Sequence, residues 1–203
     1  MISSQSRRVV VAFALVASAL FAFAFPADAS AAASRPRIVS LIPSLTEDLF
    51  AMGAGAQVVA VSEFTDHPAA AAELPTIASF TSIDVERIAR LHPGLIVGIT
   101  AQRALVGDLR RIGLPVELLR DDSFDDLFAT IARLGVLSGH VAEAAALTAH
   151  LHARTAALVA SVPHGVRPSV FVVLGTAPIY TVGDASYIAH LIALAGGRNA
   201  SGV

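Results

Sequence analysis

Histidines and carboxylates are the residues of this chain whose types and spacing could bind a metal ion or transfer protons. The sequence has seven His, 16 Asp or Glu and no Cys, so thiolate metal sites and Cys nucleophiles are excluded. His150 and His152 would point about 200° apart on one helix and could not chelate an ion together. His140 and His164 flank the same predicted helix and should be solvated. We therefore expect no metal site.

The motifs of the common enzyme classes are missing or wrongly spaced. The segment 135–139 has the wrong spacing for a nucleophile elbow, and Gly53-Ala-Gly55 lacks the third Gly of a dinucleotide fingerprint. Four acidic residues gather where a helix should begin, which stabilises the helix, and a carboxylate pair there would be exposed; they are Asp121, Asp122, Asp125 and Asp126. We expect no catalytic residue and no cofactor. A secreted hydrolase and a structural or adhesion module are the alternatives from other classes.

Aromatic side chains offer binding chemistry instead. Phe64 and Phe80 fall in loops at the carboxyl ends of predicted strands, where α/β proteins bind their ligands. Such rings supply a large apolar area at little rotamer entropy. The alternative is that both are core residues. His67 shares the loop of Phe64 and could be an axial ligand to haem or a corrinoid, or a loop residue that makes hydrogen bonds.

Composition restricts the class of protein further. The chain has 203 residues, of which 55% are apolar and 15% are charged, which excludes an intrinsically disordered protein. All 14 basic residues are Arg, and they face 16 acidic residues, so the formal net charge is −2. A nucleic-acid partner is therefore not expected.

The first residues predict a secretory signal peptide. Arg7 and Arg8 precede the uncharged segment 9–25, and Ala27-Asp28-Ala29 is a small-x-small cleavage site. A helix over 9–25 would span about 26 Å, which is shorter than a ~30 Å hydrocarbon core. An uncleaved anchor is the alternative, and general secretory and twin-arginine export both stay open. No Cys follows the segment, so we expect a free periplasmic protein rather than a lipoprotein.

The rest of the chain alternates strands and helices, which predicts an α/β fold with a parallel sheet covered on both faces. Short β-branched runs predict strands at 37–42, 58–61, 95–99, 116–119 and 169–174. Apolar periodicity and stop signals predict helices at 44–53, 84–91, 102–112, 121–134, 140–161 and 187–195.

Local signals set the expected helix ends. Ser44 and Glu47 fit a capping box after Pro43 ends the first strand. Asp84 has the type and position of an N-cap. The segment 135–139 begins and ends with Gly and should interrupt the helical pattern before the long Ala-rich helix 140–161.

Four strings follow one another along the chain: Arg37-Ile-Val-Ser-Leu-Ile-Pro-Ser-Leu-Thr-Glu47, Val61-Ser-Glu-Phe-Thr-Asp-His-Pro68, Ser82-Ile-Asp-Val-Glu-Arg-Ile88 and Leu91-His-Pro-Gly-Leu-Ile-Val97. In this order they resemble the helical-backbone (class III) periplasmic substrate-binding proteins of ABC importers, most closely the cobalamin-binding branch. The family often has Tyr at the His67 position and Asp at the Gly94 position. At the end of the 95–99 strand, where the family has a third aromatic residue, this chain has Ile99.

The resemblance implies two parallel-sheet lobes joined by one long helix, with ligand bound between them. It divides the chain into a signal peptide at 1–29, an N-terminal lobe at 30–120, a helical segment with the inter-lobe helix at 121–162, and the start of a C-terminal lobe at 163–203. One strand and one helix at 163–203 cannot cover a parallel strand on both faces, so we expect a second lobe that is incomplete in a fragment or truncated frame.

The resemblance also implies the site and the partners. Phe64, His67 and Phe80, with Tyr180 from the second lobe, would bind a bulky ligand: cobalamin or another corrinoid, alternatively haem or a ferric siderophore. Glu86 would be the first-lobe residue that docks on the ABC permease in the inner membrane. The protein would be a periplasmic monomer that captures its ligand and delivers it to the permease.

Overall fold

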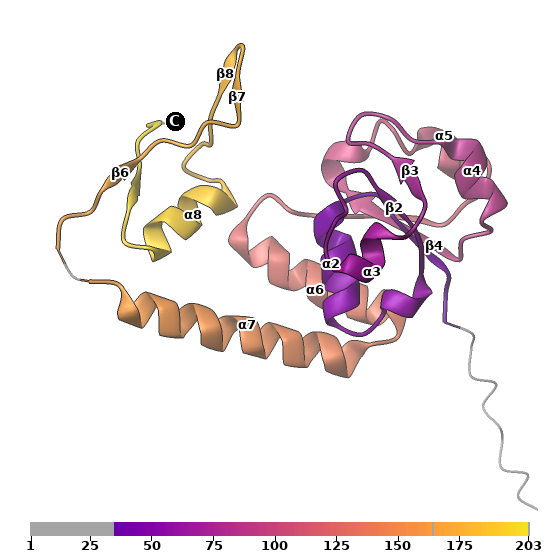
Figure 1. Ribbon diagram of the computed structural model, residues 1–203, viewed down its shortest axis with the longest axis horizontal. Coiled ribbons are helices and arrows are strands. Elements are labelled where there is room, and N and C mark those ends of the chain that lie inside the picture. Colours follow the sequence, from indigo (N-terminus) through magenta and orange to yellow (C-terminus); the bar gives the residue numbers. More distant parts are fainter. Residues whose placement is uncertain (1–34, 164, 203) are drawn as a thin grey trace, which may run out of the picture. The chain divides into compact units, whose positions relative to one another are not determined.

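The computed structural model describes residues 35–163 and 165–202 (Figure 1). The predicted signal peptide, 1–29, lies outside the described residues. The described part is organised around a five-stranded sheet with helices on its two faces.

The sheet is formed by β1 (Ile38–Ser40), β2 (Val58–Ser62), β3 (Thr76–Ala78), β4 (Leu95–Ile99) and β5 (Val116–Leu119). Its order is β3-β2-β1-β4-β5, and every neighbouring pair is parallel. The predicted parallel α/β architecture is therefore confirmed. The first four predicted strands are present, and β3 is an additional strand for which the sequence pattern gives no range.

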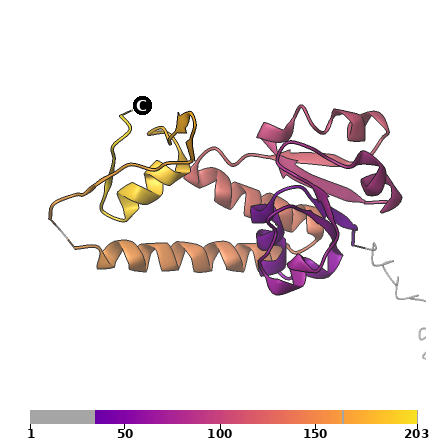
Figure 2. The same cartoon turned by 45° about the horizontal axis from the view of Figure 1, so that its top comes forward.

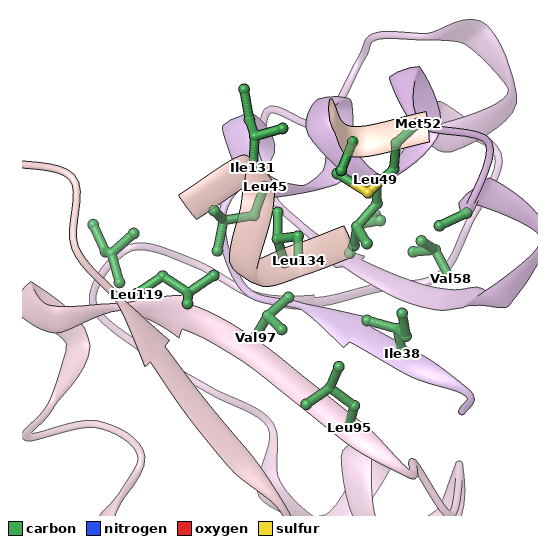
Figure 3. Close-up of a cluster of buried hydrophobic side chains, with 14 residues drawn as sticks. Ile38, Leu45, Leu49, Met52, Val58, Leu95, Val97, Leu119, Ile131 and Leu134 are labelled. Carbon is green, nitrogen blue, oxygen red and sulfur yellow. The ribbon is translucent and has the colours of Figure 1, made fainter. Parts of the chain in front are cut away.

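One face of the sheet is covered by α2 (Pro43–Ala51), α6 (Phe124–Ser138) and α7 (Val141–Ser161). Their side chains join alternate strand residues in one buried cluster, shown in Figure 3, which includes Ile38, Leu49, Val97 and Leu134. Because side chains alternate along a strand, the intervening residues face the other way. They meet α4 (Val85–Arg90) and α5 (Gly107–Arg111) in a second cluster.

Helix ends confirm some of the capping predictions and correct another. Asp84 caps α4, since its Oδ1 accepts the backbone N–H of Arg87 at 2.9 Å. The predicted capping box at Ser44 is wrong, because α2 already begins at Pro43, whose missing N–H is harmless in the first turn. Thr46 donates its hydroxyl to the Ile42 carbonyl oxygen at 3.2 Å instead.

The helical segment also differs from its prediction. Gly135 does not interrupt the pattern, because α6 continues to Ser138 and ends only at Gly139, whose φ is 77°. The long helix α7 is confirmed, with His140 as its N-cap residue. In both views α6 runs beside α7 (Figures 1 and 2). The helix predicted at 102–112 is only a 3₁₀ turn, Thr100–Gln102, followed by the short α5.

Residues 165–202 contain a further α/β unit. β6 (Ser169–Val170) pairs in parallel with β9 (Arg198–Asn199), and α8 (Tyr187–Leu194) connects them in sequence. The strand predicted at 169–174 is thus shorter than expected, and α8 is confirmed. β7 (Gly175–Thr176) and β8 (Ile179–Tyr180) form an antiparallel hairpin where only a loop was predicted. Two short elements complete the description, α3 (Ala69–Ala72) and a 3₁₀ turn at Gly55–Gln57.

Candidate functional site

Two exposed phenylalanines lie at the carboxyl edge of the parallel sheet. Phe64 follows β2 with 87% of its side chain exposed, and Phe80 follows β3 with 63% exposed. The alternative that these rings are core residues is therefore wrong. Because β2 and β3 are neighbours in the sheet, the two loops emerge side by side.

Hydrogen bonds fix the two loops that carry these rings. The N–H of Glu63 donates to the carbonyl oxygen of Ala78 at 2.8 Å and ties the loops together. In the second loop the Ser79 Oγ accepts the N–H of Ser82 at 3.0 Å, which closes a tight turn around Phe80. The structure thus presents two large apolar rings at the carboxyl edge of the sheet, on loops that these hydrogen bonds hold in place.

Phe64 has an unusual backbone conformation. Its φ is 62°, in the left-handed region that bulky L residues rarely adopt. The Ser62 and Thr65 hydroxyls on either side of it lie 3.3 Å apart and are buried. Local strain that keeps an apolar ring in solvent is typical of functional loops.

His67 lies in the same loop as Phe64 but faces different residues. It lines a cavity of about 360 Å³ with Pro68, with α2 residues that include Asp48, and with Leu147 and Leu151 of α7. Neither Phe64 nor Phe80 lines this cavity. The structure therefore does not bring His67 and the two phenylalanines together around one cavity.

Asp48 in this cavity was not identified from the sequence. Burial raises the pKa of its carboxyl group from 3.8 to about 7, and the neighbouring Glu47 charge adds to the shift. A carboxyl group in this state can donate a hydrogen bond near neutral pH. Two of the apolar residues that line this cavity with Asp48, Leu147 and Leu151, come from α7, far away in sequence, so the sequence around Asp48 does not by itself indicate its burial.

Tyr180 is presented by the β7–β8 hairpin. It lies opposite Gly175, and its side chain is 60% exposed. A methyl group on Gly175 would lie 3.0 Å from the Tyr180 ring, so the glycine allows the ring to pack across the hairpin. Among the residues that the structure describes, the aromatic ring pairs include none of Phe64, Phe80 and Tyr180. Their shared role stays a prediction.

Glu86 has the geometry that its predicted role requires. It lies in the first turn of α4, and its side chain is 89% exposed. Its Oε2 is 3.8 Å from Nη1 of Arg90, one turn further along the helix. Ile88 of the same helix is fully buried, so Glu86 points away from the core, as expected.

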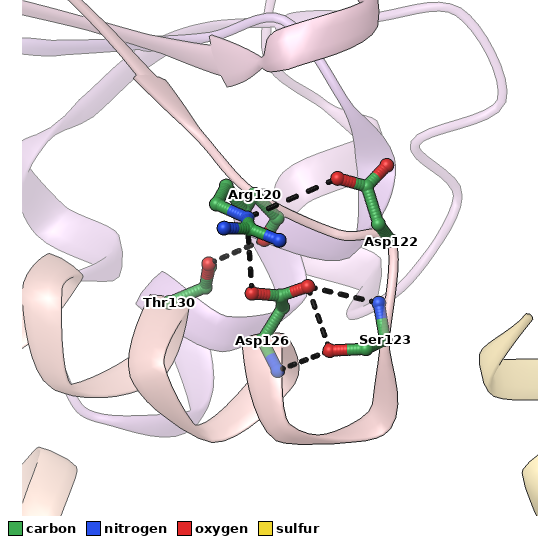
Figure 4. A network of polar contacts seen from close by, with 5 residues as sticks. All are labelled: Arg120, Asp122, Ser123, Asp126 and Thr130. Atoms are coloured by element: carbon green, nitrogen blue, oxygen red, sulfur yellow. Dashed lines mark hydrogen bonds and ion pairs between the residues drawn. The ribbon is translucent and has the colours of Figure 1, made fainter. Parts of the chain in front are cut away.

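The acidic residues after β5 play different parts (Figure 4). Asp126 accepts from the backbone N–H and the hydroxyl of Ser123 at 2.9 and 2.7 Å, and Arg120 Nε lies 3.2 Å from its Oδ1. These contacts lower the pKa of Asp126, with the Ser123 hydroxyl as the main cause. Burial raises the pKa of Asp121 instead, with a smaller part from Asp122. The four carboxylates are therefore not one equivalent exposed cluster.

His140 corrects the expectation of a solvated side chain. It is 4% exposed, and its Nδ1 lies 3.1 Å from the Ser138 carbonyl oxygen and 3.3 Å from Nε2 of Gln57. Through these contacts the His140 imidazole links the turn between α6 and α7 to the 3₁₀ turn at Gly55–Gln57, just before β2. Its burial makes it a structural residue.

The residues that the structure describes contain neither a metal-ligating cluster nor a membrane-spanning helix. Within 35–163 and 165–202 there is no group of three or more His, Cys, Asp or Glu arranged to hold a metal ion. In the same ranges no helix is both long enough and apolar enough to cross a bilayer.

Comparison with known proteins connects this geometry with a family. Residues 38–202 match the family described as periplasmic binding protein. The chain is 30% identical over 171 residues to a vitamin B12-binding protein of Pectobacterium atrosepticum, covering 80% of this chain and 61% of that one. A vitamin B12-binding protein of Yersinia pestis is 31% identical over 166 residues, with 80% and 59% covered. The chain thus spans about three fifths of the length of these relatives.

Solved structures agree with the sequence relatives. The periplasmic vitamin B12 binding protein BtuF of Vibrio cholerae superposes with a TM-score of 0.71 at 28% identity, covering 83% of this chain and 69% of that one. The periplasmic heme-binding protein RhuT of Roseiflexus superposes with a TM-score of 0.73 at 28% identity, with 84% and 68% covered. From its sequence match over nearly all the described residues, this chain belongs to the periplasmic binding protein family.

Proposed function

We propose that this chain captures a bulky ligand in the periplasm as the substrate-binding component of an ABC importer, and that the ligand is cobalamin or another corrinoid. The observation that carries the proposal is the pair of exposed rings, Phe64 and Phe80, on neighbouring loops at the carboxyl edge of the sheet. Exposed aromatic rings that a loop holds in solvent are costly unless something covers them, and a flat macrocycle would do so. The vitamin B12-binding relatives support the choice of ligand.

Haem is the second candidate. It presents a flat face similar to that of a corrinoid, and the RhuT structure, of a heme-binding protein, is as similar in sequence as BtuF. A ferric siderophore is the third. Within this proposal Tyr180 would contact the ligand from the second lobe, and His67 would contribute from the rim of its own cavity.

The division of the chain and its partners belong to the same proposal. Residues 1–29 would direct export, 30–120 and 163–203 would contribute the two lobes, and 121–162 would connect them. The protein would act as a monomer, without a catalytic step, and the exposed Glu86 would meet an Arg of the permease. Turnover of any hydrolase substrate by the purified protein would favour the enzyme alternative.

A titration with three ligands tests the function. Purified protein is titrated with cyanocobalamin, haemin and ferrichrome, with ligand absorbance and the thermal shift of the protein as readouts. We expect saturable binding of one of them well below ~100 μM, the weak end for a capture protein. Binding of none of the three below that concentration contradicts the proposal.

A further inference from the structure

Four aromatic rings form a continuous stack across three helices. The His152 imidazole of α7 lies on Phe128 of α6, with ring centroids 3.9 Å apart and planes inclined by 21°. Phe128 meets Phe124 edge to face, with centroids 5.3 Å apart. Phe124 then stacks on His190 of α8, with centroids 4.7 Å apart and planes inclined by 14°. We call these four residues the ring ladder.

The two ends of the ring ladder differ in what else holds them. The two helices at the α7 end, α6 and α7, also contact each other elsewhere along their length, where a methyl group on Gly135 would lie 2.5 Å from the Ala144 Cβ. At the α8 end the residues around Phe124 and His190 line an open cavity of about 290 Å³. The Phe124–His190 stack is therefore the more separable of the two, and it joins α8 to the helical segment.

Imidazole is the ring type in the ring ladder that can also carry a positive charge. Both imidazoles are solvent-exposed while both phenylalanines are partly buried. An unperturbed imidazole gains its charge between pH 8 and pH 5. A cation over the face of an aromatic ring is attracted by the negative face of that ring.

The charged groups around His190 act in the same direction. Asp125 of α6 and Asp184 of the loop before α8 line the same cavity as His190, and both attract a protonated imidazole. Arg198 of β9, which also packs against α8, is not among the lining residues. Tyr187 is one turn away on α8 itself.

His152 has no charged residue one turn away on its own helix, and the nearest charge in sequence is Arg154, two residues further along α7. One turn to either side of it on α7 are Thr148, Ala149, Thr155 and Ala156. On α6 the ionisable residue one turn before Phe128 is Asp125, which also attracts a cation.

We infer that the ring ladder is a pH-sensitive latch, which holds α8 more tightly to α6 when the imidazoles are protonated. A neutral imidazole only stacks on Phe124, whereas a protonated imidazole adds cation–π attraction and attraction to the two carboxylates that line the same cavity. Acidification therefore strengthens the attachment of the 165–202 unit to the helical segment 121–162. The inference concerns the attachment of two parts of the chain and stands whichever ligand the protein binds.

Hydrogen exchange of the α8 amides measures this attachment directly. Exchange rates at 187–194 are compared at pH 5 and pH 8 after correction for intrinsic rates. We expect protection to be about two- to fivefold greater at pH 5, the range that a solvent-exposed cation–π contact supplies. In His190→Gln this difference should disappear.

Two further variants separate the ring ladder from other causes. Phe124→Leu removes the ring face but keeps Asp125 and Asp184, so the pH difference should fall to less than half. His150→Gln is the matched control, because His150 is exposed on α7 outside the ring ladder, and it should behave like the parent protein. A pH difference that survives in His190→Gln, or that is unchanged in Phe124→Leu, overturns the inference.

Discussion

Gly135 of α6 faces Ala144 of α7 so closely that a methyl group on Gly135 would lie 2.5 Å from the Ala144 Cβ. The same methyl group would lie 3.1 Å from the carbonyl oxygen of His140. Ala144 is buried and belongs to the cluster on the α2 face of the sheet. The absence of a side chain at Gly135 therefore allows α7 to approach α6 closely.

Gly135→Ala should destabilise the protein although alanine is the better helix former. The helix propensity gain is about 1 kcal/mol, whereas forcing an extra methyl group into a packed contact costs about 1–3 kcal/mol. We expect a net loss in the free energy of unfolding, measured by urea denaturation. Gly107→Ala is the control, since a methyl group there meets no atom within 4 Å. A Gly135→Ala variant as stable as the control would contradict this packing.

Asp48→Asn should stabilise the protein at neutral pH and not in acid. The folded protein keeps the Asp48 proton up to a pKa of about 7, while the unfolded chain loses it near 3.8. Unfolding therefore releases a proton between these values, and stability falls as the pH rises through that window. Asparagine resembles the protonated form and avoids the fall, a gain of at most ~4 kcal/mol at pH 8.

The measurement is the free energy of unfolding at pH 4 and pH 8 for the parent protein and for Asp48→Asn. The gain should appear at pH 8 and nearly vanish at pH 4. Asp108→Asn is a control, because its exposed carboxylate is paired with Arg111 on α5. Equal effects of Asp48→Asn at the two pH values would show that burial does not control this carboxyl group.

Ser123→Ala should weaken the start of α6. The Ser123 hydroxyl accepts the Asp126 N–H at 3.2 Å and donates to the Asp126 carboxylate at 2.7 Å. Loss of an N-cap typically costs ~1 kcal/mol, so the urea midpoint should fall correspondingly. Ser161→Ala, at the exposed end of α7, should have a much smaller effect. If the two variants are equally stable, the Ser123–Asp126 pair does not cap α6.

Glu86→Arg tests the proposed docking on the permease. The variant places a positive charge where a permease Arg should approach, so uptake through the assembled importer should fall severalfold while ligand affinity stays unchanged. Glu73→Arg reverses another exposed charge, at the end of α3, and should leave uptake intact. A parallel fall in ligand affinity, or normal uptake, would remove Glu86 from the docking surface.

The sheet could be predicted from sequence because its strands are short runs of buried residues. Ile96 and Val97 are adjacent and contribute to opposite clusters, as the alternation along a strand requires. β3 was missed because Thr76–Ala78 follows a proline and contains one branched apolar residue among small ones. Its position is set by pairing with β2 rather than by its own sequence.

Two of the errors at helix boundaries have one physical origin, which is that glycine and proline can either end a helix or lie within it. Pro43 was interpreted as a stop but begins α2. Gly135 was interpreted as a break but allows close helix packing within α6. In each case tertiary contacts decide whether the helix ends at that residue, and those contacts cannot be read from a single sequence.

The candidate site could be predicted in part. Phe64, Phe80 and Glu86 are exposed where the sequence pattern put them. The burial of His140, the raised pKa of Asp48 and the stack of His190 on Phe124 all depend on segments far apart in the chain. No local spacing rule connects Phe124 with His190, because their approach is fixed by how α8 folds back onto α6.

Corrinoid binding by Phe64→Ala/Phe80→Ala tests the central claim most directly. Isothermal titration with cyanocobalamin compares the parent protein, the double variant and Phe171→Ala, which removes another exposed ring, 51% exposed, on a different part of the chain. The account predicts at least a tenfold loss of affinity in the double variant, because each ring contributes about 1 kcal/mol or more of buried apolar contact, and no loss in Phe171→Ala. Undiminished binding by the double variant would contradict the proposed site.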